Sequence, residues 1–118
     1  MDDIEIVCVP VGAQGGTVNR PLFHVPVGFG GITLTKAYIR AGGASTSVMQ
    51  LQNLGTAFGT TVSSVIGTLN GTLVANVQQE FLITTAYQAE NTWLGLGTGA
   101  GGSLDAATEL VIEFAYGK

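Results

Sequence analysis

The stretch Glu109-Leu-Val-Ile-Glu-Phe-Ala-Tyr116, near the end of the 118-residue chain, decides the fold class. Its large apolar residues recur at every second position, and the residues between them are acidic, small or β-branched. The apolar face holds Leu110, Ile112, Phe114 and Tyr116, and the alternate face holds Glu109, Val111, Glu113 and Ala115. A period of two is typical of a β-strand with one face in a core. We therefore predict a strand at 109–116, with the earlier strands packed around it.

Shorter segments of the same kind precede this strand and are separated by glycine-rich turns. They are rich in β-branched and aromatic residues, and none shows the i, i+3, i+4, i+7 spacing of an amphipathic helix. Asn70-Gly71 is a strong signal for a tight type I′ hairpin. In the segment 32–40 neither face is uniformly apolar, so the sequence does not decide whether Lys36 points toward the core or toward solvent. The extended segments before the last strand are 4–9, 21–26, 32–40, 47–52, 61–69, 73–78, 81–85 and 93–96.

Seven or eight strands with turns at roughly eight-to-twelve-residue spacing predict an all-β protein. We favour an antiparallel two-sheet β-sandwich of jelly-roll type. The first segment ends before Pro10, which cannot donate to a ladder, so we place it at a sheet edge or on a subunit surface. We therefore divide the chain into an N-terminal strand or arm, 1–20, and a β-sandwich domain, 21–118.

Composition limits the class of partner. The chain is 46% hydrophobic, which suffices for a core, but only 10% charged, against roughly 25% in ordinary soluble domains. Such a charge-poor surface suggests cover by partner subunits. The net charge of −4 with four cations argues against nucleic acid and anionic membranes as partners. The N-terminus is acidic and resembles no export signal, so we expect synthesis in a reducing cytoplasm.

One motif formally matches a nucleotide-binding loop. Gly97, Gly99 and Gly102 have the spacing G-x-G-x-x-G after a predicted strand. A dinucleotide site needs a helix and a parallel crossover after that motif. Only about half a dozen residues separate Gly102 from Glu109, whereas a crossover to a parallel strand needs a dozen or more. We interpret the run as an exposed hairpin loop.

The residues give no catalytic or metal constellation. His24 is the sole histidine and Cys8 the sole cysteine, so neither has a partner for a metal site or a disulfide. The serines lack a G-x-S-x-G elbow. Glu109 and Glu113 lie about 13 Å apart on an extended strand, farther than glycosidase carboxylates. We expect a non-enzymatic protein and assign no catalytic, cofactor-binding or metal-ligating residue.

Several segments together resemble small virion proteins of tailed phages. They are the run 32–40 with the following glycine turn, the segment 46–56, the segment 89–97 with its glycine loop, and the ending 109–117. The resemblance covers residues 21–118 and is one of strand and turn texture, without a fixed signature. It implies a jelly-roll sandwich that serves as a capsid decoration (cement) protein or a head- or tail-fibre module. It also implies a homo-oligomer, often a trimer, on the capsid surface, with the major capsid protein as partner.

Two functions follow from this resemblance. The first is a structural decoration protein that binds the major capsid protein and stabilises the phage head, with 1–20 reaching a neighbouring subunit or the shell. The alternative is a receptor- or glycan-binding module of a fibre. Aromatic residues with nearby amide and carboxylate groups would then form an exposed cluster. The candidates are Tyr38, Tyr87 and Trp93, with Gln88, Glu90 and Asn91.

Overall fold

The structure is a computed structural model that describes residues 3–13, 19–43, 49–57, 62–98, 104–105 and 107–118. Its described part is all-β, as predicted, with nine strands rather than seven or eight. None of it forms a helix long and apolar enough to cross a membrane. The strands are β1 (Glu5–Pro10), β2 (Arg20–His24), β3 (Ile32–Arg40), β4 (Met49–Asn53), β5 (Ser64–Leu69), β6 (Gln79–Ile83), β7 (Tyr87–Gln88), β8 (Trp93–Thr98) and β9 (Glu109–Tyr116).

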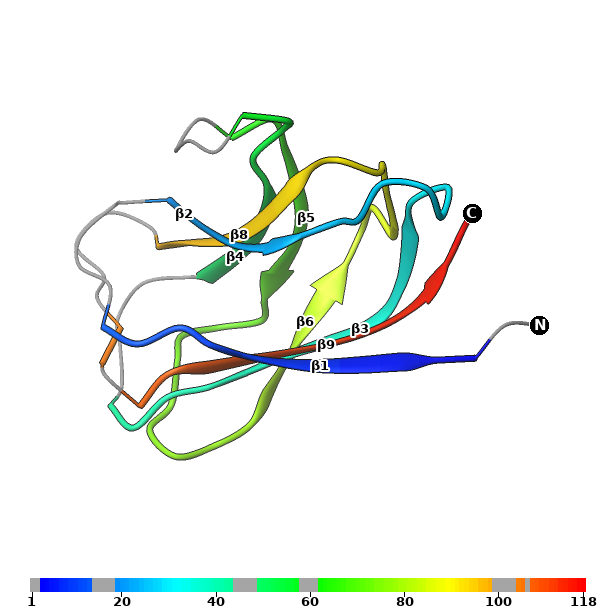
Figure 1. The fold of residues 1–118 in the computed structure, drawn as a ribbon. Helices are drawn as coiled ribbons and strands as arrows, with labels where there is room; N and C mark the ends of the chain where they lie inside the picture. Colours follow the sequence, from blue (N-terminus) through cyan, green and yellow to red (C-terminus); the bar gives the residue numbers. More distant parts are fainter. Residues whose placement is uncertain (1–2, 14–18, 44–48, 58–61, 99–103, 106) are drawn as a thin grey trace.

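The strands form a single antiparallel path that nearly closes on itself. The order is β1-β9-β3-β6-β5-β4-β8-β2, and the short β7 pairs separately with β3. Strand β6 turns the path, because Gln79 and Glu80 pair with β3 whereas Phe81–Ile83 pair with β5. Figure 1 shows β1, β9 and β3 facing β2, β8 and β4, with β6 between the two groups. The result is a barrel-like sheet that is open between its edge strands, β1 and β2.

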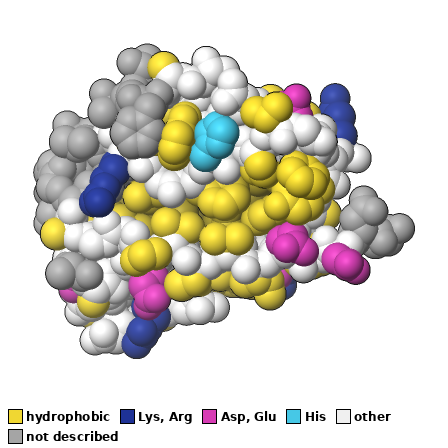
Figure 2. Space-filling view, viewed as in Figure 1, with side chains coloured by type: hydrophobic (Ala, Val, Ile, Leu, Met, Phe, Trp, Pro, Cys, Tyr) yellow, Lys and Arg dark blue, Asp and Glu magenta, His cyan; other side chains and the backbone are white. Residues whose placement is uncertain are grey.

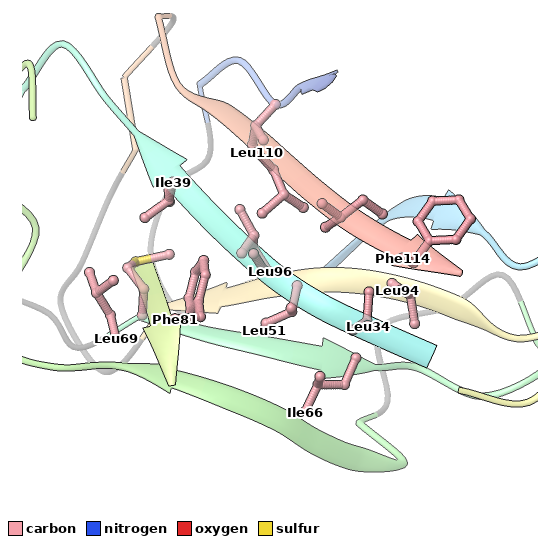
Figure 3. Packing of buried hydrophobic residues seen from close by; sticks show 14 of the residues in the cluster. Leu34, Ile39, Leu51, Ile66, Leu69, Phe81, Leu94, Leu96, Leu110 and Phe114 are labelled. Atoms are coloured by element: carbon pink, nitrogen blue, oxygen red, sulfur yellow. The ribbon is translucent and has the colours of Figure 1, made fainter. Parts of the chain in front are cut away.

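The core fills the space enclosed by this path. Leu110, Ile112 and Phe114 of β9 are essentially inaccessible to solvent, as the period-two pattern predicts. Figure 3 shows the side chains of β9 and β3 directed toward Leu94 and Leu96 of β8 and toward residues of β4, β5 and β6. Burial of each such side chain stabilises the fold by about 1.5–3 kcal/mol. The remaining face of β9 is half-buried, apart from Ala115, which is buried.

A β-bulge explains why neither face of β3 looked apolar in the sequence. The pairing of β3 with β9 shifts its register between Leu34 and Lys36. The inserted residue reverses the alternation, so that Leu34 and then Ala37 both point into the core. Lys36 is consequently exposed, which settles the open question of its position.

The predicted tight hairpin at Asn70-Gly71 is wrong. Strands β5 and β6 do pair, but residues 70–78 connect them as a loop, and the predicted strand 73–78 forms no ladder. Gly71 has φ +92° while Asn70 is not in the positive-φ region that a type I′ turn requires. The loop persists because Leu73 is buried in the core and the side chain of Gln79 bonds back to it. The Gln79 amide donates to the Thr72 carbonyl (3.0 Å) and its oxygen accepts from the Val74 amide (2.7 Å).

Two further predictions from the sequence are wrong. Other predictions fall on residues that the structure does not describe. The short strand β7 lies within 86–91, between the predicted segments 81–85 and 93–96, where the polar sequence predicts a loop or a short helical turn instead of a strand. The glycine run does not close a hairpin, because β8 pairs with β4 and β2 whereas β9 pairs with β1 and β3. Most of that run (99–102), the starts of two predicted strands (47–48 and 61) and residues 1–2 and 14–18 of the N-terminal segment are not described.

Candidate functional site

The sole histidine and the sole cysteine lie on the two edge strands of the sheet. His24, at the end of β2, contacts Trp93 of β8 in a tilted arrangement with 4.7 Å between ring centroids, and its Nε2 lies 3.1 Å from Asn91 Oδ1. Cys8 lies on β1, which pairs with β9 at the other end of the strand path. Among the described residues, no group of three or more histidine, cysteine or acidic side chains is placed to hold a metal ion.

The surroundings of Cys8 disfavour its thiolate. The thiol is exposed and donates a hydrogen bond to Glu109 Oε2 over 3.4 Å. This hydrogen bond, partial loss of water and repulsion by the carboxylate, in that order, raise the pKa of the Cys8 thiol above its ordinary value. A nucleophilic cysteine needs the opposite, electropositive environment. The apolar neighbours of Cys8 in the sequence predict a packed or half-buried side chain, and its exposure in the structure shows that this prediction is wrong.

The alternate face of β9 combines acidic residues with the cations of β3. Glu109 pairs in register with Arg40, and Glu113 pairs with Lys36. Both glutamates are half-buried. Each carboxylate thus has a cation as its cross-strand neighbour, an arrangement that stabilises sheets modestly. This geometry suits a charged sheet face or a contact surface, with both carboxylates on one strand.

Gly97, the first glycine of the run, is packed beneath side chains. A Cβ added there would overlap the Gln52 side-chain amide and approach Asn19 Oδ1 to 2.6 Å. A larger residue at this point would therefore displace the ends of the Gln52 and Asn19 side chains. A phosphate-binding loop would instead present open backbone amides to a ligand.

The aromatic residues expected for a glycan site do not form an exposed cluster, because all three are half-buried and lie on three different strands. Tyr38 lies on β3 opposite Val111 and Glu80, whereas Trp93 lies on β8 opposite His24. The Tyr87 hydroxyl donates to the Gly30 carbonyl over 2.9 Å. The remaining polar candidates, Gln88 and Glu90, are also engaged within the chain, as the next paragraphs describe.

Gln88 belongs to a buried amide network that the sequence did not reveal. The side-chain amide of Asn53 donates to Gln88 Oε1 (2.8 Å) and Thr92 Oγ1 (3.1 Å), and its oxygen accepts from the Gly55 amide (2.8 Å). Gln88 in turn donates to the Thr85 carbonyl over 2.7 Å. The network connects β4 to the β7–β8 segment, and its polar groups satisfy one another, so its role is structural.

Glu90 holds the turn between β2 and β3. Its Oε2 accepts hydrogen bonds from the backbone amides of Gly28 (2.9 Å) and Gly30 (3.2 Å). The Gly117 amide also donates to the Gly31 carbonyl over 2.8 Å. Gly28, Gly30 and Gly31 all have φ between 75° and 102°, which L side chains rarely adopt. The turn is thus fixed from both sides, and it carries Phe29 at its tip.

Phe29 begins a row of aromatic side chains across the opening between the edge strands. Its ring stacks on Tyr116 at 4.6 Å, Tyr116 meets Phe114 edge-on at 5.5 Å, and Phe114 lies 5.7 Å from Phe23 of β2. We call these four residues the aromatic row. Phe114 belongs to the core, but Phe29 is 55% exposed and the neighbouring Val27 is 62% exposed. Figure 2 shows a broad apolar area on this side of the molecule, with acidic side chains at its border.

No protein-family model and no curated protein matches the sequence. A solved structure does match the fold, namely a chain of the "Cyanophage Pam1 capsid asymmetric unit". The TM-score is 0.62 with 12% sequence identity, and the match covers 99% of this chain and 86% of that one. At this identity the likeness concerns the fold, and it extends over essentially the whole chain.

Proposed function

We propose that the protein is a non-enzymatic structural component of a phage virion, namely a capsid decoration protein. It would be made in the host bacterial cytoplasm, bind the major capsid protein on the capsid surface and stabilise the head. The observation that carries this proposal is the likeness of fold to a chain of a cyanophage capsid unit, which covers 99% of the protein.

We also propose that the barrel-like sheet is a jelly-roll sandwich. The support is the strand order, which divides into two sets of four, β1-β9-β3-β6 and β5-β4-β8-β2. Each set combines strands that are distant in the chain, as expected when two sheets are wound from Greek keys. Figure 1 agrees with two facing layers that meet at β6.

The composition and surface support an oligomer, which we propose to be a trimer. Only 10% of the residues are charged, and several large apolar side chains are exposed, among them Ile6 on β1 and Leu82 on β6. Apolar groups of this kind mark surfaces that partners cover. Residues 1–20 would contribute to such contacts through Ile4 and Ile6, which point away from the core.

Mass measurement and binding to shells test this function. Light scattering should give a particle of three 12.1 kDa chains. The protein should then co-sediment saturably with heads of the encoding phage that lack it, and should not bind free capsid subunits. A monomer that stays in the supernatant with such heads contradicts the decoration role.

A further inference from the structure

We propose that Phe29 and Tyr116, at the exposed end of the aromatic row, form with the neighbouring Val27 the surface that docks onto the capsid shell. Its counterpart would be an apolar hollow with a basic rim on the major capsid protein. This inference rests on the proposed decoration function and adds to it the contact face and the chemistry of the partner.

The first argument is that the structure presents Phe29 in a fixed position. Its turn is held by two hydrogen bonds to Glu90 and one from the Tyr87 hydroxyl, and its ring is stacked on Tyr116. Binding through a rigid aromatic group loses little conformational entropy. Large aromatic side chains that enter a partner's pocket commonly dominate the affinity of protein interfaces. An exposed phenyl ring on a turn fixed in this way has the properties of such an anchor.

The second argument is the charge around the anchor. Glu5 pairs in register with Phe114, so its carboxylate borders the aromatic row, and Asp3 precedes it by two residues. Both side chains are exposed. Figure 2 shows acidic groups beside the apolar area. A partner with lysine or arginine around its hollow would complement this border and would be steered toward it.

The third argument is that a second copy of the chain offers no such basic rim. The chain has four cations in total. Lys36 and Arg40 face Glu113 and Glu109 across strands. Arg20 of β2 donates to the Ala13 carbonyl (3.1 Å), and the Lys118 ammonium lies 5.2 Å from the centre of the Tyr87 ring. The four cations are thus divided among β2, β3 and the last residue of the chain. With a net charge of −4, the acidic border favours a different, basic protein.

The test measures binding of the full chain to heads of the encoding phage that lack the protein. We expect Phe29→Ala to weaken binding by about thirtyfold, the effect of losing an interface anchor. Val27→Asp should weaken it as well and leaves the stacked pair of Phe29 and Tyr116 intact. Glu5→Lys should weaken binding at low salt, whereas wild-type binding should fall as salt rises. The matched controls are Asn70→Ala, at an exposed position of the 70–78 loop, and Glu80→Lys, at an exposed position of β6, which should bind as the wild type does.

The possible outcomes separate the inference from the proposed function. Thermal unfolding of each variant first identifies any that is not folded. Wild-type affinity in both Phe29→Ala and Val27→Asp would overturn the docking face while the decoration function stands. An altered mass of Phe29→Ala in solution, with shell binding retained, would assign the face to a second copy instead. Failure of the wild type to bind heads would overturn both proposals.

Discussion

At the scale of single residues, Asn53 is the buried polar side chain on which the connection between β4 and the β7–β8 segment depends. Asn53→Ala removes three hydrogen bonds and leaves Gln88 Oε1 and the Gly55 amide without this partner. A buried polar group that loses its partner costs about 1–3 kcal/mol, so we expect a loss of about 2–4 kcal/mol in the free energy of unfolding. Urea unfolding measures this loss, and the slope of the free energy of unfolding against urea concentration should be unchanged. Asn70→Ala, at an exposed position, should change stability by less than about 0.5 kcal/mol.

Cys8 provides a residue-scale probe of the pairing between β1 and β9. Because the hydrogen bond to Glu109 and the negative charge of Glu109 both raise the pKa of the thiol, Glu109→Gln should lower that pKa. The thiolate fraction at a fixed mildly alkaline pH then rises, and alkylation by iodoacetamide becomes faster. Glu113 lies opposite Ile6, so Glu113→Gln should leave the pH dependence of the rate of Cys8 alkylation unchanged. Equal shifts in both variants would contradict the contact between Cys8 and Glu109.

At the scale of elements, the approach of β5 to β6 depends on Gly67. A Cβ at this position would lie 2.5 Å from the Leu82 carbonyl oxygen and 3.1 Å from the Ile83 Cα. Both contacts are with backbone, so the two strands must separate to admit a methyl group. We expect Gly67→Ala to cost about 1–3 kcal/mol, as overpacking typically does. The control is Gly43→Ala, because a Cβ at Gly43 would make an ordinary 3.4 Å contact with Asp105. Thermal unfolding should show a lower melting temperature for Gly67→Ala and an almost unchanged one for Gly43→Ala.

The elements that the sequence predicted well are those with local causes. Strand β9 follows from its own period of two, since one face is uniformly apolar. The bulge in β3 was not predictable, because it depends on the register with β9, more than seventy residues away in the chain. The hairpin at Asn70-Gly71 failed for a similar reason: burial of Leu73 in a core built from distant strands outweighed the local turn preference.

The candidate docking face shows the same division between local and distant causes. The sequence identified the segment 27–31 as a glycine-rich turn, which the three positive φ values confirm. It did not single out Phe29, because the ring's exposure is fixed by Glu90, Tyr87 and Tyr116, which lie about sixty to ninety residues away.

At the scale of the whole molecule, the barrel-like path makes β1 one of its two edges, so the first ten residues bear on the integrity of the sheet. All six residues of β1 pair with β9, and Val7 and Val9 pack against the core. Deletion of residues 1–10 would uncover the edge of β9, a strand whose inner face is core. Burial of two valines at about 1.5 kcal/mol each suggests a loss of about 3 kcal/mol, and an uncovered edge promotes aggregation.

We therefore expect the chain without residues 1–10 to melt well below the intact protein and to form large particles in light scattering. Deletion of residues 1–3 alone removes no residue of the β1 ladder and should preserve both the melting temperature and the mass. The comparison separates two uses of the N-terminal segment. If the longer deletion melts like the intact protein but loses shell binding, β1 acts as a detachable arm. If it unfolds, β1 completes the sheet, and contacts with the shell must come from the side chains that the intact edge presents.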